Sequence, residues 1–219
     1  WLLKSHDNMD VVAARAGVLN KQSSWVLNFL GIDVPILLTD ASPRFDSVTQ
    51  RLDTITPDAT VSEAWSIASR TGGIAPVVEL DGTPFGLITG NSLFHLINEL
   101  IGPNPQKETT TLSDFFNIPC SYAADKSVEK FNKNLRIRDL IKKILREEHN
   151  EFWVVDDGNK YYGIVRQRDL LNPPRIRLIL VDHNEVQQAV SALDEAELIE
   201  ILDHHRLGNP PTNAPIKFN

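Results

Sequence analysis

Two short polar clusters near the end of the sequence carry residue types suited to metal-dependent phosphate chemistry. The run 175–181 reads as a buried strand, and Asp182-His183-Asn184-Glu185 follows it directly. Asp203-His204-His205-Arg206 begins 21 residues after Asp182. Carboxylates and imidazoles at the ends of neighbouring parallel strands suit manganese or cobalt, and two such ions roughly 4 Å apart can activate a bridging water for attack on phosphorus. A lone His-His pair is more often structural, but the two clusters together at this spacing indicate a metal site.

A second group of candidate binding residues surrounds Asp169. A ribose diol is recognised by a carboxylate, an adenine by a flat apolar slot, and phosphates by guanidinium groups. Asp169 stands at a predicted helix start, residues 152–154 supply the apolar wall, and the charge comes from Arg166, Arg168 and Lys133. In the alternative interpretation, both arginines face solvent and Asp169 only caps its helix.

These residues lie in a sequence that repeats after about 76 residues. In the first copy, helical spacing over 61–70 is followed by a strand at 74–79, a turn, a strand at 85–88 and a helix over 93–101. In the second copy, a helix from Ile137 precedes strands at 152–155 and 161–165, and a further helix starts near Arg168. Two tandem βαββα units are the economical interpretation.

The repeat resembles the CBS domains, which pair in tandem as a Bateman module, over roughly residues 45 to 172. Its most specific element is glycine, two apolar residues, a hydroxyl residue and, three further on, an aspartate. The first copy keeps Thr89 but has Ser92 for the acid, whereas the second keeps Asp169 but has Arg166 for the hydroxyl. The resemblance implies binding of AMP, ADP or ATP, with better support in the second copy, at Thr56, Ala75, Pro76, Thr89, Ser92, Lys133, Phe152, Trp153, Val154, Gly163, Arg166, Arg168 and Asp169.

The flanking segments resemble the DHH phosphoesterases, specifically the family II inorganic pyrophosphatases. Besides the two polar clusters, the resemblance covers Ala14-Arg15-Ala16-Gly17, a helix over 25–31 and an apolar stretch at 34–38. Some members of that family carry a CBS pair between two halves of the catalytic domain. The expected order is therefore catalytic segment 1–44, CBS domains 45–104 and 105–172, and catalytic segment 173–219, an α/β fold with the pair inserted in a partial parallel-sheet domain.

The resemblance to pyrophosphatases implies a role for each polar residue near the end of the chain. Asp182 and His204 would be ligands of Mn²⁺ or Co²⁺, and the catalytic residue His205 would lie near the substrate phosphate. Asp203 would orient a neighbour or be structural. The family's opening metal motif is absent, so we expect this chain alone to be inactive or nearly so. The stretch 193–202 is predicted to be an acidic helix that exposes Asp194, Glu195, Glu197 and Glu200.

Composition excludes other classes of protein. The 219 residues include 22 Lys+Arg, 29 Asp+Glu and one cysteine, with a formal net charge of −7. Thirteen Lys/Arg against eight Asp/Glu make residues 126–177 locally basic, but aromatic-basic interleaving typical of nucleic-acid binding is absent. The single cysteine favours a cytoplasmic protein, and the apolar runs are too short for a membrane span.

Two functions stay open on the sequence alone. The chain is either the nucleotide-binding regulatory part of a metal-dependent pyrophosphatase, or a stand-alone nucleotide sensor with vestigial flanks. CBS pairs commonly dimerise, so a homodimer is expected through the apolar faces of the helices that follow Ser92 and Asp169.

Overall fold

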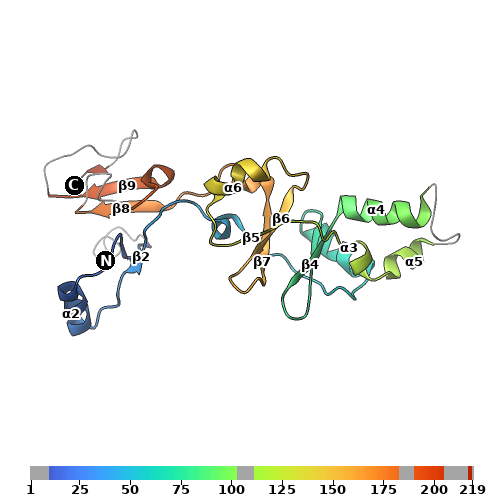
Figure 1. Cartoon of the computed structure of the whole chain (residues 1–219), viewed down its shortest axis with the longest axis horizontal. Coiled ribbons are helices and arrows are strands. Elements are labelled where there is room, and N and C mark those ends of the chain that lie inside the picture. The colour runs from blue at the N-terminus through green and yellow to red at the C-terminus, as the bar shows by residue number, and fades with distance from the viewer. Residues whose placement is uncertain (1–9, 103–110, 183–189, 205–216, 219) are drawn as a thin grey trace. The chain divides into compact units, whose positions relative to one another are not determined.

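The computed structural model describes residues 10–102, 111–182, 190–204 and 217–218. The chain divides into two units. One comprises Arg44–Pro174, and the other combines Trp1–Pro43 with Arg175–Asn219. The fold is mixed α/β with small sheets, and the first unit holds two similar substructures built from the repeat (Figure 1).

The first copy contains the predicted helix-strand-strand-helix order. A capping box between Thr60 and Glu63 starts its first helix, and both backbone and side-chain bonds of that box are present. Its antiparallel hairpin is followed directly by the second helix, which Thr89 caps. A short helix and a 3-10 turn that the sequence did not predict complete the copy. The elements are α3 (Val61–Arg70), β3 (Ile74–Val78), β4 (Pro84–Thr89), α4 (Gly90–Ile101), α5 (Leu112–Asn117) and η2 (Cys120–Tyr122).

The second copy repeats this order up to its hairpin and then differs. Its elements are β5 (Lys130–Asn132), α6 (Ile137–Ile144), β6 (Glu151–Val155), β7 (Tyr161–Arg166) and the 3-10 turn η3 (Gln167–Leu170). The helix predicted from Arg168 onward is wrong, because only this four-residue turn forms. Pro173 and Pro174 follow after Leu171 and Asn172, and a proline disfavours helical backbone in the residue before it.

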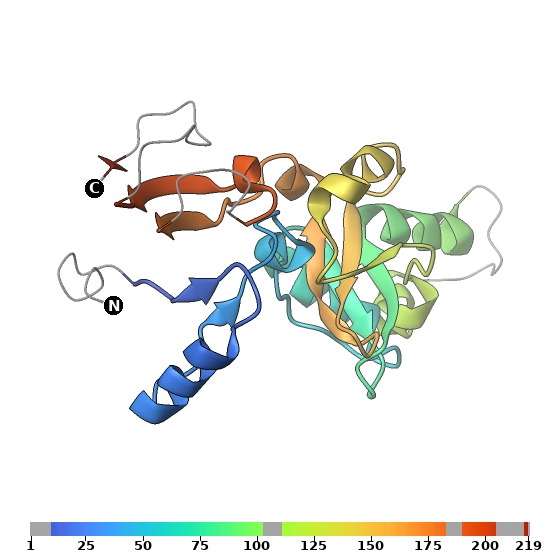
Figure 2. The same ribbon diagram turned by 60° about the vertical axis from the view of Figure 1, so that its left-hand side comes forward.

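The segment that precedes the first helix of each copy, its leading segment, pairs with the hairpin of the other copy. The two copies thus exchange their leading segments. Gln50, which precedes the first copy, forms a backbone bridge with Ile164 of β7, and Asp125, which precedes the second copy, bridges Leu87 of β4. Ile164 and Leu87 are equivalent in the repeat, so Gln50 and Asp125 are equivalent too. Figure 2 shows the two hairpins side by side. A buried cluster joins them, formed by Ile74, Val78, Leu87, Val128, Trp153 and Ile164.

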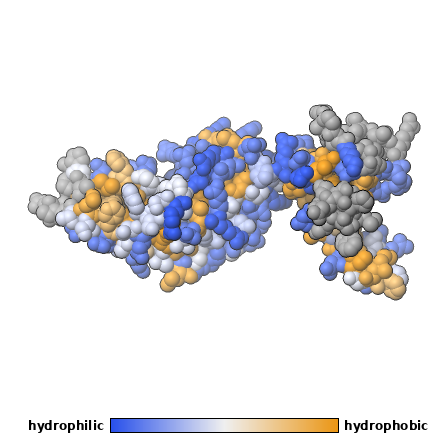
Figure 3. Space-filling model, turned by 180° about the vertical axis from the view of Figure 1, so that it is seen from behind, coloured by the Kyte–Doolittle hydropathy of each residue, from blue (hydrophilic) through white to orange (hydrophobic). Residues whose placement is uncertain are grey.

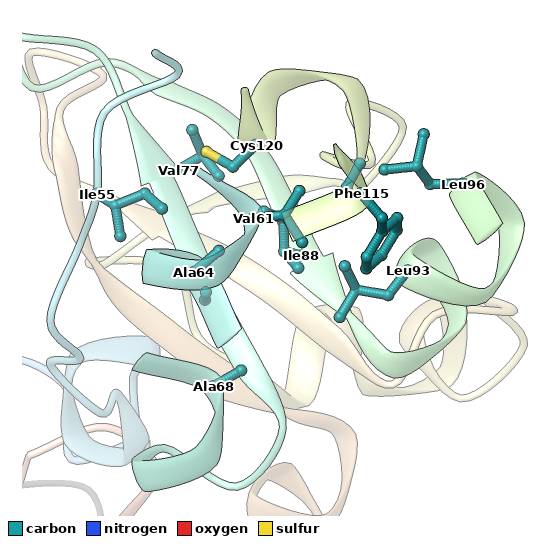
Figure 4. Packing of buried hydrophobic residues seen from close by; sticks show 12 residues of the cluster. Ile55, Val61, Ala64, Ala68, Val77, Ile88, Leu93, Leu96, Phe115 and Cys120 are labelled. Carbon is teal, nitrogen blue, oxygen red and sulfur yellow. The ribbon is translucent and has the colours of Figure 1, made fainter. Parts of the chain in front are cut away.

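Each copy also has its own hydrophobic core. In the first, α3 and α4 pack on the hairpin around Val61, Ile88 and Phe115, with the buried Cys120 among them (Figure 4). In the second, Phe131 stacks on Phe45, whose segment η1 (Phe45–Val48) precedes the first copy. The exchange of leading segments therefore ties the two cores into one unit.

The flanking unit contains two small parallel sheets. The segments β1 (Ala14–Arg15) and β2 (Ile36–Leu37) pair with each other around α2 (Lys21–Leu30). The second sheet has the order β10-β9-β8, from β8 (Arg177–Val181), β9 (Glu197–Leu202) and β10 (Lys217–Phe218), with η5 (Leu193–Glu195) before β9. Of the predicted buried strand, only Leu180 is buried.

The predicted acidic helix over 193–202 is wrong. Its second half is β9, which runs parallel to β8 with Val181 beside Leu202. Glu200, predicted to be exposed, is 5% exposed, and its Oε1 lies 3.3 Å from Nζ of Lys217. The acidic spacing that suggested a helix is outweighed by the tertiary pairing of Leu198, Ile201 and Leu202 with an apolar strand.

The helix α2 leaves its apolar side chains on the surface. It buries no residue, and Trp25 and Phe29 stack on each other at 64% and 73% exposure. Figure 3 shows apolar surface over this helix. Contiguous apolar surface of this kind is typical of a face that contacts other protein. Among the described residues, no helix is long and apolar enough to cross a bilayer.

Candidate functional site

The exchange of leading segments creates two cavities, each lined by residues of both copies. The second cavity, of about 660 Å³, lies beside the end of β7. Its walls come from the segment that leads into the first copy, the end of α3, the start of β6 and the turn η3. The lining residues are Gln50, Leu52, Arg70, Thr71, Gly72, Asn150, Glu151, Arg166, Gln167, Arg168 and Leu171.

A hydrogen-bonded network fixes the polar groups of the second cavity. The Arg166 guanidinium donates through Nη1 to Oε1 of Gln50 at 2.9 Å and through Nη2 to the Thr71 carbonyl at 2.7 Å. Nε2 of Gln50 donates to Oδ2 of Asp169 at 3.2 Å. Asp169 does not line the cavity itself, but its side chain is 25% exposed and contacts Gln50, which does. The carboxylate is thus held by the cavity wall.

Positive charge dominates the outer part of the second cavity. Arg70 and Arg168 have side chains 65% and 72% exposed, so their guanidinium groups are open to an anion. Arg70 lies 4.0 Å from Asp53, and Arg168 lies 3.6 Å from Asp169. Glu151 is the one carboxylate among the residues that line this cavity.

The first cavity occupies the equivalent place in the first copy but has different chemistry. It measures about 510 Å³ and contains the hydroxyls of Thr89 and Ser92. Both hydroxyls are engaged in the α4 capping box, with Thr89 N donating to Ser92 Oγ at 2.9 Å. Its acidic and histidine lining residues are His95, Glu99, Asp125, Glu148, His149 and Glu151, and no arginine or lysine is among its lining.

Asp125, the equivalent of Gln50, organises the first cavity. It accepts from the Ser127 hydroxyl at 2.6 Å, and its Oδ2 lies 3.0 Å from Nε2 of His149. Burial raises the pKa of the Asp125 carboxyl, but hydrogen bonds from Ser127 and His149 outweigh it and leave the pKa below its usual value. The aspartate therefore stays charged, and this cavity is acidic at neutral pH.

Several residues predicted to contact a nucleotide lie in the interior. Phe152 packs against Phe131, and Trp153 contacts Tyr161 edge to face. Neither cavity is lined by these side chains. The predicted residues buried in this way are Ala75, Pro76, Phe152, Trp153, Val154 and Gly163. Because their side chains are already packed, any contact with a ligand depends on movement or on backbone atoms, and their role stays a prediction.

Two further predicted residues lie away from both cavities. The Lys133 ammonium lies 5.1 Å from the centre of the Tyr162 ring. The Thr56 carbonyl accepts from the amide of Ala59 and lies 3.3 Å from Sγ of Cys120. Burial raises the pKa of the Cys120 thiol to about 11, so this group is a neutral part of the core.

The flanking unit brings Asp182, Asp203 and His204 together. Val181 pairs with Leu202, so the residues that follow β8 and β9 stand side by side, and the Asp182 amide donates to the Leu202 carbonyl at 2.8 Å. Asp182 has a φ of 63°, a left-handed conformation that aspartate tolerates. Nδ1 of His204 lies 3.2 Å from Oδ1 of Asp182.

This cluster fits part of a metal site. One ligand atom from each of Asp182, Asp203 and His204 lies within 4.8 Å of the others. Donors that share one ion at about 2.1 Å stand within roughly 4.2 Å of one another, so a small contraction suffices. Two oxygens and a nitrogen suit manganese or cobalt. Asp203, read from the sequence as an orienting or structural residue, belongs to the cluster, whereas His205 lies outside the described residues.

Sequence reasoning missed the residues that the other copy contributes to the second cavity. Gln50, Arg70, Thr71 and Gly72 all belong to the first copy or its leading segment. A signal was present in the sequence, because Gln50 lies 11 residues before the start of α3 and Asp125 lies 12 residues before the start of α6. The repeat predicted from the sequence begins with the helix over 61–70, so it does not include these two residues.

Comparisons with known proteins agree with this architecture. Residues 46–99 and 123–173 match the CBS domain family. A probable manganese-dependent inorganic pyrophosphatase of Thermotoga maritima (strain ATCC 43589 / DSM 3109 / JCM 10099 / NBRC 100826 / MSB8) is 31% identical over 102 residues, which is 47% of this chain and 19% of that protein. A cobalt-dependent inorganic pyrophosphatase of Clostridium perfringens (strain 13 / Type A) is 28% identical over 153 residues, 66% of this chain and 28% of that protein. The chain thus matches less than a third of the length of either relative.

Among solved structures, a CBS domain-containing protein of unknown function from Bacillus anthracis str. Ames Ancestor aligns with a TM-score of 0.49 and 11% identity. The alignment covers 59% of this chain and 90% of that protein.

Proposed function

Because this chain carries a pair of CBS domains, we propose that it binds an adenine nucleotide, AMP, ADP or ATP, in the second cavity. The observation that carries the proposal is the combination of a held carboxylate and two exposed guanidinium groups around one cavity. Asp169 accepts from a ribose hydroxyl, and Arg70 and Arg168 bind phosphate. The cavity volume of about 660 Å³ is within the range of small-ligand sites.

The roles of the three arginines differ. Arg166 already donates to Gln50 and to the Thr71 carbonyl, so it organises the wall. Arg70 and Arg168 have the exposed side chains and supply the charge that a phosphate requires. A conservative change to lysine would lose the forked geometry with which arginine binds phosphate oxygens.

The adenine ring has an apolar surface available at the cavity edge. Leu52 and Leu171 line the cavity, and Leu171 is 63% exposed. Gly72 adds backbone that a flat ring can approach closely. These residues, rather than the buried Phe152–Val154 strand, are the accessible wall.

We further propose that the flanking unit is part of a metal-dependent pyrophosphatase, a proposal supported by the grouping of Asp182, Asp203 and His204, whose ligand atoms suit Mn²⁺ or Co²⁺. The curated relatives are named as pyrophosphatases with these metals, which supports the assignment. A bound ion would supply an activated water for hydrolysis of pyrophosphate to two phosphates. Asp182, Asp203 and His204 would hold the ion, and His205 would bind the substrate phosphate. Within the described residues these three donors are too few for two ions, and we expect the isolated chain to be inactive or nearly so.

Nucleotide binding then serves regulation. A nucleotide that binds one arrangement of the CBS pair better than another shifts the pair toward that arrangement. In the second candidate function, a stand-alone sensor with vestigial flanks, the nucleotide would bind equally well but the metal cluster would bind no ion. Measuring Co²⁺ binding therefore separates the two.

Assembly as a homodimer is also proposed. Phe94 of α4 is 64% exposed and provides an apolar contact. The second helix expected to contribute is replaced by η3, where Leu171 is exposed. Light scattering at micromolar concentration tests this, and a strict monomer refutes it.

The experiment that tests the site compares AMP with adenosine by calorimetry on the wild type and on Arg168→Ala. Loss of the Arg168 guanidinium should weaken the binding of AMP about tenfold or more. The affinity for adenosine should be nearly unchanged, because adenosine has no phosphate. An equal loss of affinity for both ligands would show that Arg168 does not bind the phosphate. Arg138→Ala, an exposed arginine outside both cavities, is the matched control.

A further inference from the structure

A hydrogen bond between Gln50 and Asp169 links the segment that enters the CBS pair to the segment that leaves it. The unit begins at Arg44 and ends at Pro174, so Gln50 lies six residues after its start and Asp169 five residues before its end. Nε2 of Gln50 donates to Oδ2 of Asp169 at 3.2 Å. The incoming and outgoing segments, 44–50 and 169–174, are therefore bonded to each other through one side-chain contact.

The incoming segment is otherwise attached to the second copy. The amides of Phe45 and Asp46 donate to the carbonyls of Leu135 and Lys133, and Gln50 exchanges both backbone bonds with Ile164 at 2.8 and 2.9 Å. The Gln50 side chain is thereby aimed at the end of β7 and the turn η3. The close approach of the Gln50 carbonyl to Gly163, 2.6 Å from where a Cβ would stand, fixes this position further.

The same carboxylate is the group that a ribose diol needs. The Asp169 side chain is 25% exposed and does not line the cavity, whereas its hydrogen-bond partner Gln50 does. Oδ2 of Asp169 already accepts from the amide of Gln50, so a diol hydroxyl that donates to that oxygen competes with Gln50 for it. We infer that the Gln50–Asp169 hydrogen bond is a ligand-sensitive clasp between the two connections, which a bound nucleotide opens. This inference rests on the proposed nucleotide site and adds how occupancy reaches the flanking segments.

The clasp explains why the partner of Asp169 is a glutamine in this cavity. In the first cavity the equivalent residue is Asp125, which stays bonded to Ser127 and His149 of the second copy. None of Asp125, Ser127 and His149 lies within six residues of Arg44 or Pro174, where the unit begins and ends. The second cavity is therefore the one placed to couple ligand binding to residues 43 and 175.

A first test needs no ligand. Hydrogen exchange of the full chain is compared between the wild type and two variants. Gln50→Ala removes the clasp. Gln50→Glu keeps an acceptor for Arg166 but places a second carboxylate against Asp169. Both should accelerate exchange severalfold in peptides 44–51 and 166–174. Ser47→Ala is the matched control, since Ser47 is exposed in the same segment and bonds only to the Arg44 carbonyl at 2.6 Å. Unchanged exchange in both Gln50 variants overturns the clasp.

A second test adds AMP. In the wild type, AMP should accelerate exchange in 44–51, and in Gln50→Ala it should add nothing there. AMP affinity should rise about threefold to tenfold in Gln50→Ala, because a competing hydrogen bond of ordinary strength is removed. Binding of AMP without any change in these peptides overturns the clasp alone. Absence of AMP binding in calorimetry overturns the proposed nucleotide site, and the first test then decides whether the clasp is structural.

Discussion

Nδ1 of His204 lies 3.2 Å from Oδ1 of Asp182 because two parallel strands end side by side. The contact would be an ordinary ion pair if Asp203 did not place a third ligand atom within 4.8 Å of both. The Asp182 side chain is 57% exposed and the His204 side chain is 81% exposed, so an ion from solvent can reach the cluster.

We predict that Co²⁺ binds this cluster and that His204→Ala weakens the binding about tenfold or more, since an imidazole nitrogen is lost from the ligand set. Calorimetry with Co²⁺ alone measures this without any activity assay. Asp194→Ala, an exposed acidic change in the same unit, should leave the affinity unchanged. Equal affinity in His204→Ala would contradict the metal site.

The different charges of the two cavities predict one bound AMP for each chain. The first cavity is lined by Glu99, Asp125, Glu148 and Glu151 and by no arginine or lysine, so a phosphate there meets repulsion. The stoichiometry from calorimetry or equilibrium dialysis should be close to one. Two sites of similar affinity would show that the acidic lining does not exclude the nucleotide.

Gly163 should be essential for the exchange of leading segments. A Cβ at this position would collide with Thr49 and stand 2.6 Å from the carbonyl of Gln50. Gly163→Ala is therefore expected to lower the free energy of unfolding by about 1–3 kcal/mol. Gly90→Ala, which meets nothing within 4 Å at the start of α4, is the control and should be neutral or slightly stabilising. Equal free energies of unfolding for the two variants in urea would contradict the close packing of Gly163 against Thr49 and Gln50.

The hairpin turns of the two copies are linked by a charged pair. Nζ of Lys160 donates to Oδ2 of Asp81 at 2.8 Å, and the Thr83 amide donates to Oδ1 of Asp81 at 2.9 Å. These bonds, that from Lys160 foremost, lower the pKa of Asp81 to about 2. A depressed folded-state pKa stabilises the protein above the unfolded value near 3.8, and this stability is lost as pH falls toward 2. NMR titration should give a pKa of about 2 for Asp81 in the wild type and a higher pKa in Lys160→Met, where the hydrogen bonds from Thr83 remain. An unchanged Asp81 titration in the variant would show that the pair does not form.

Much of the CBS unit could be predicted from the sequence, because its signals are local. Apolar spacing, the capping residue Thr60 and the turn glycines all act within one element, and the helices and hairpins formed where they were expected. The helix after Asp169 failed for a local reason too, since Pro173 and Pro174 end it. The acidic stretch before Asp203 was misread because β9 is specified by its pairing with β8, which helical spacing cannot reveal.

The binding residues were harder to predict than the elements. Asp169, Arg166 and Arg168 follow from the motif of the second copy, but their partners Gln50 and Arg70 come from the other copy. Residues 116 positions apart, such as Gln50 and Arg166, meet only after the leading segments have exchanged. The stretch Phe152–Val154 was predicted as the wall for adenine because it is apolar, and its side chains are buried for the same reason, so its contact with a ligand stays a prediction.

The central claim is that Asp169 recognises the ribose of an adenine nucleotide in the second cavity. Calorimetry with AMP on the wild type and on Asp169→Ala tests it most directly, with Asp139→Ala as an exposed aspartate control outside both cavities. AMP should bind saturably to both proteins. Its affinity for Asp169→Ala should be about tenfold or more lower than for the wild type, because charge-assisted hydrogen bonds to the ribose are lost. Equal affinity for AMP in the two proteins would contradict the role of Asp169, and no heat with either would contradict nucleotide binding itself.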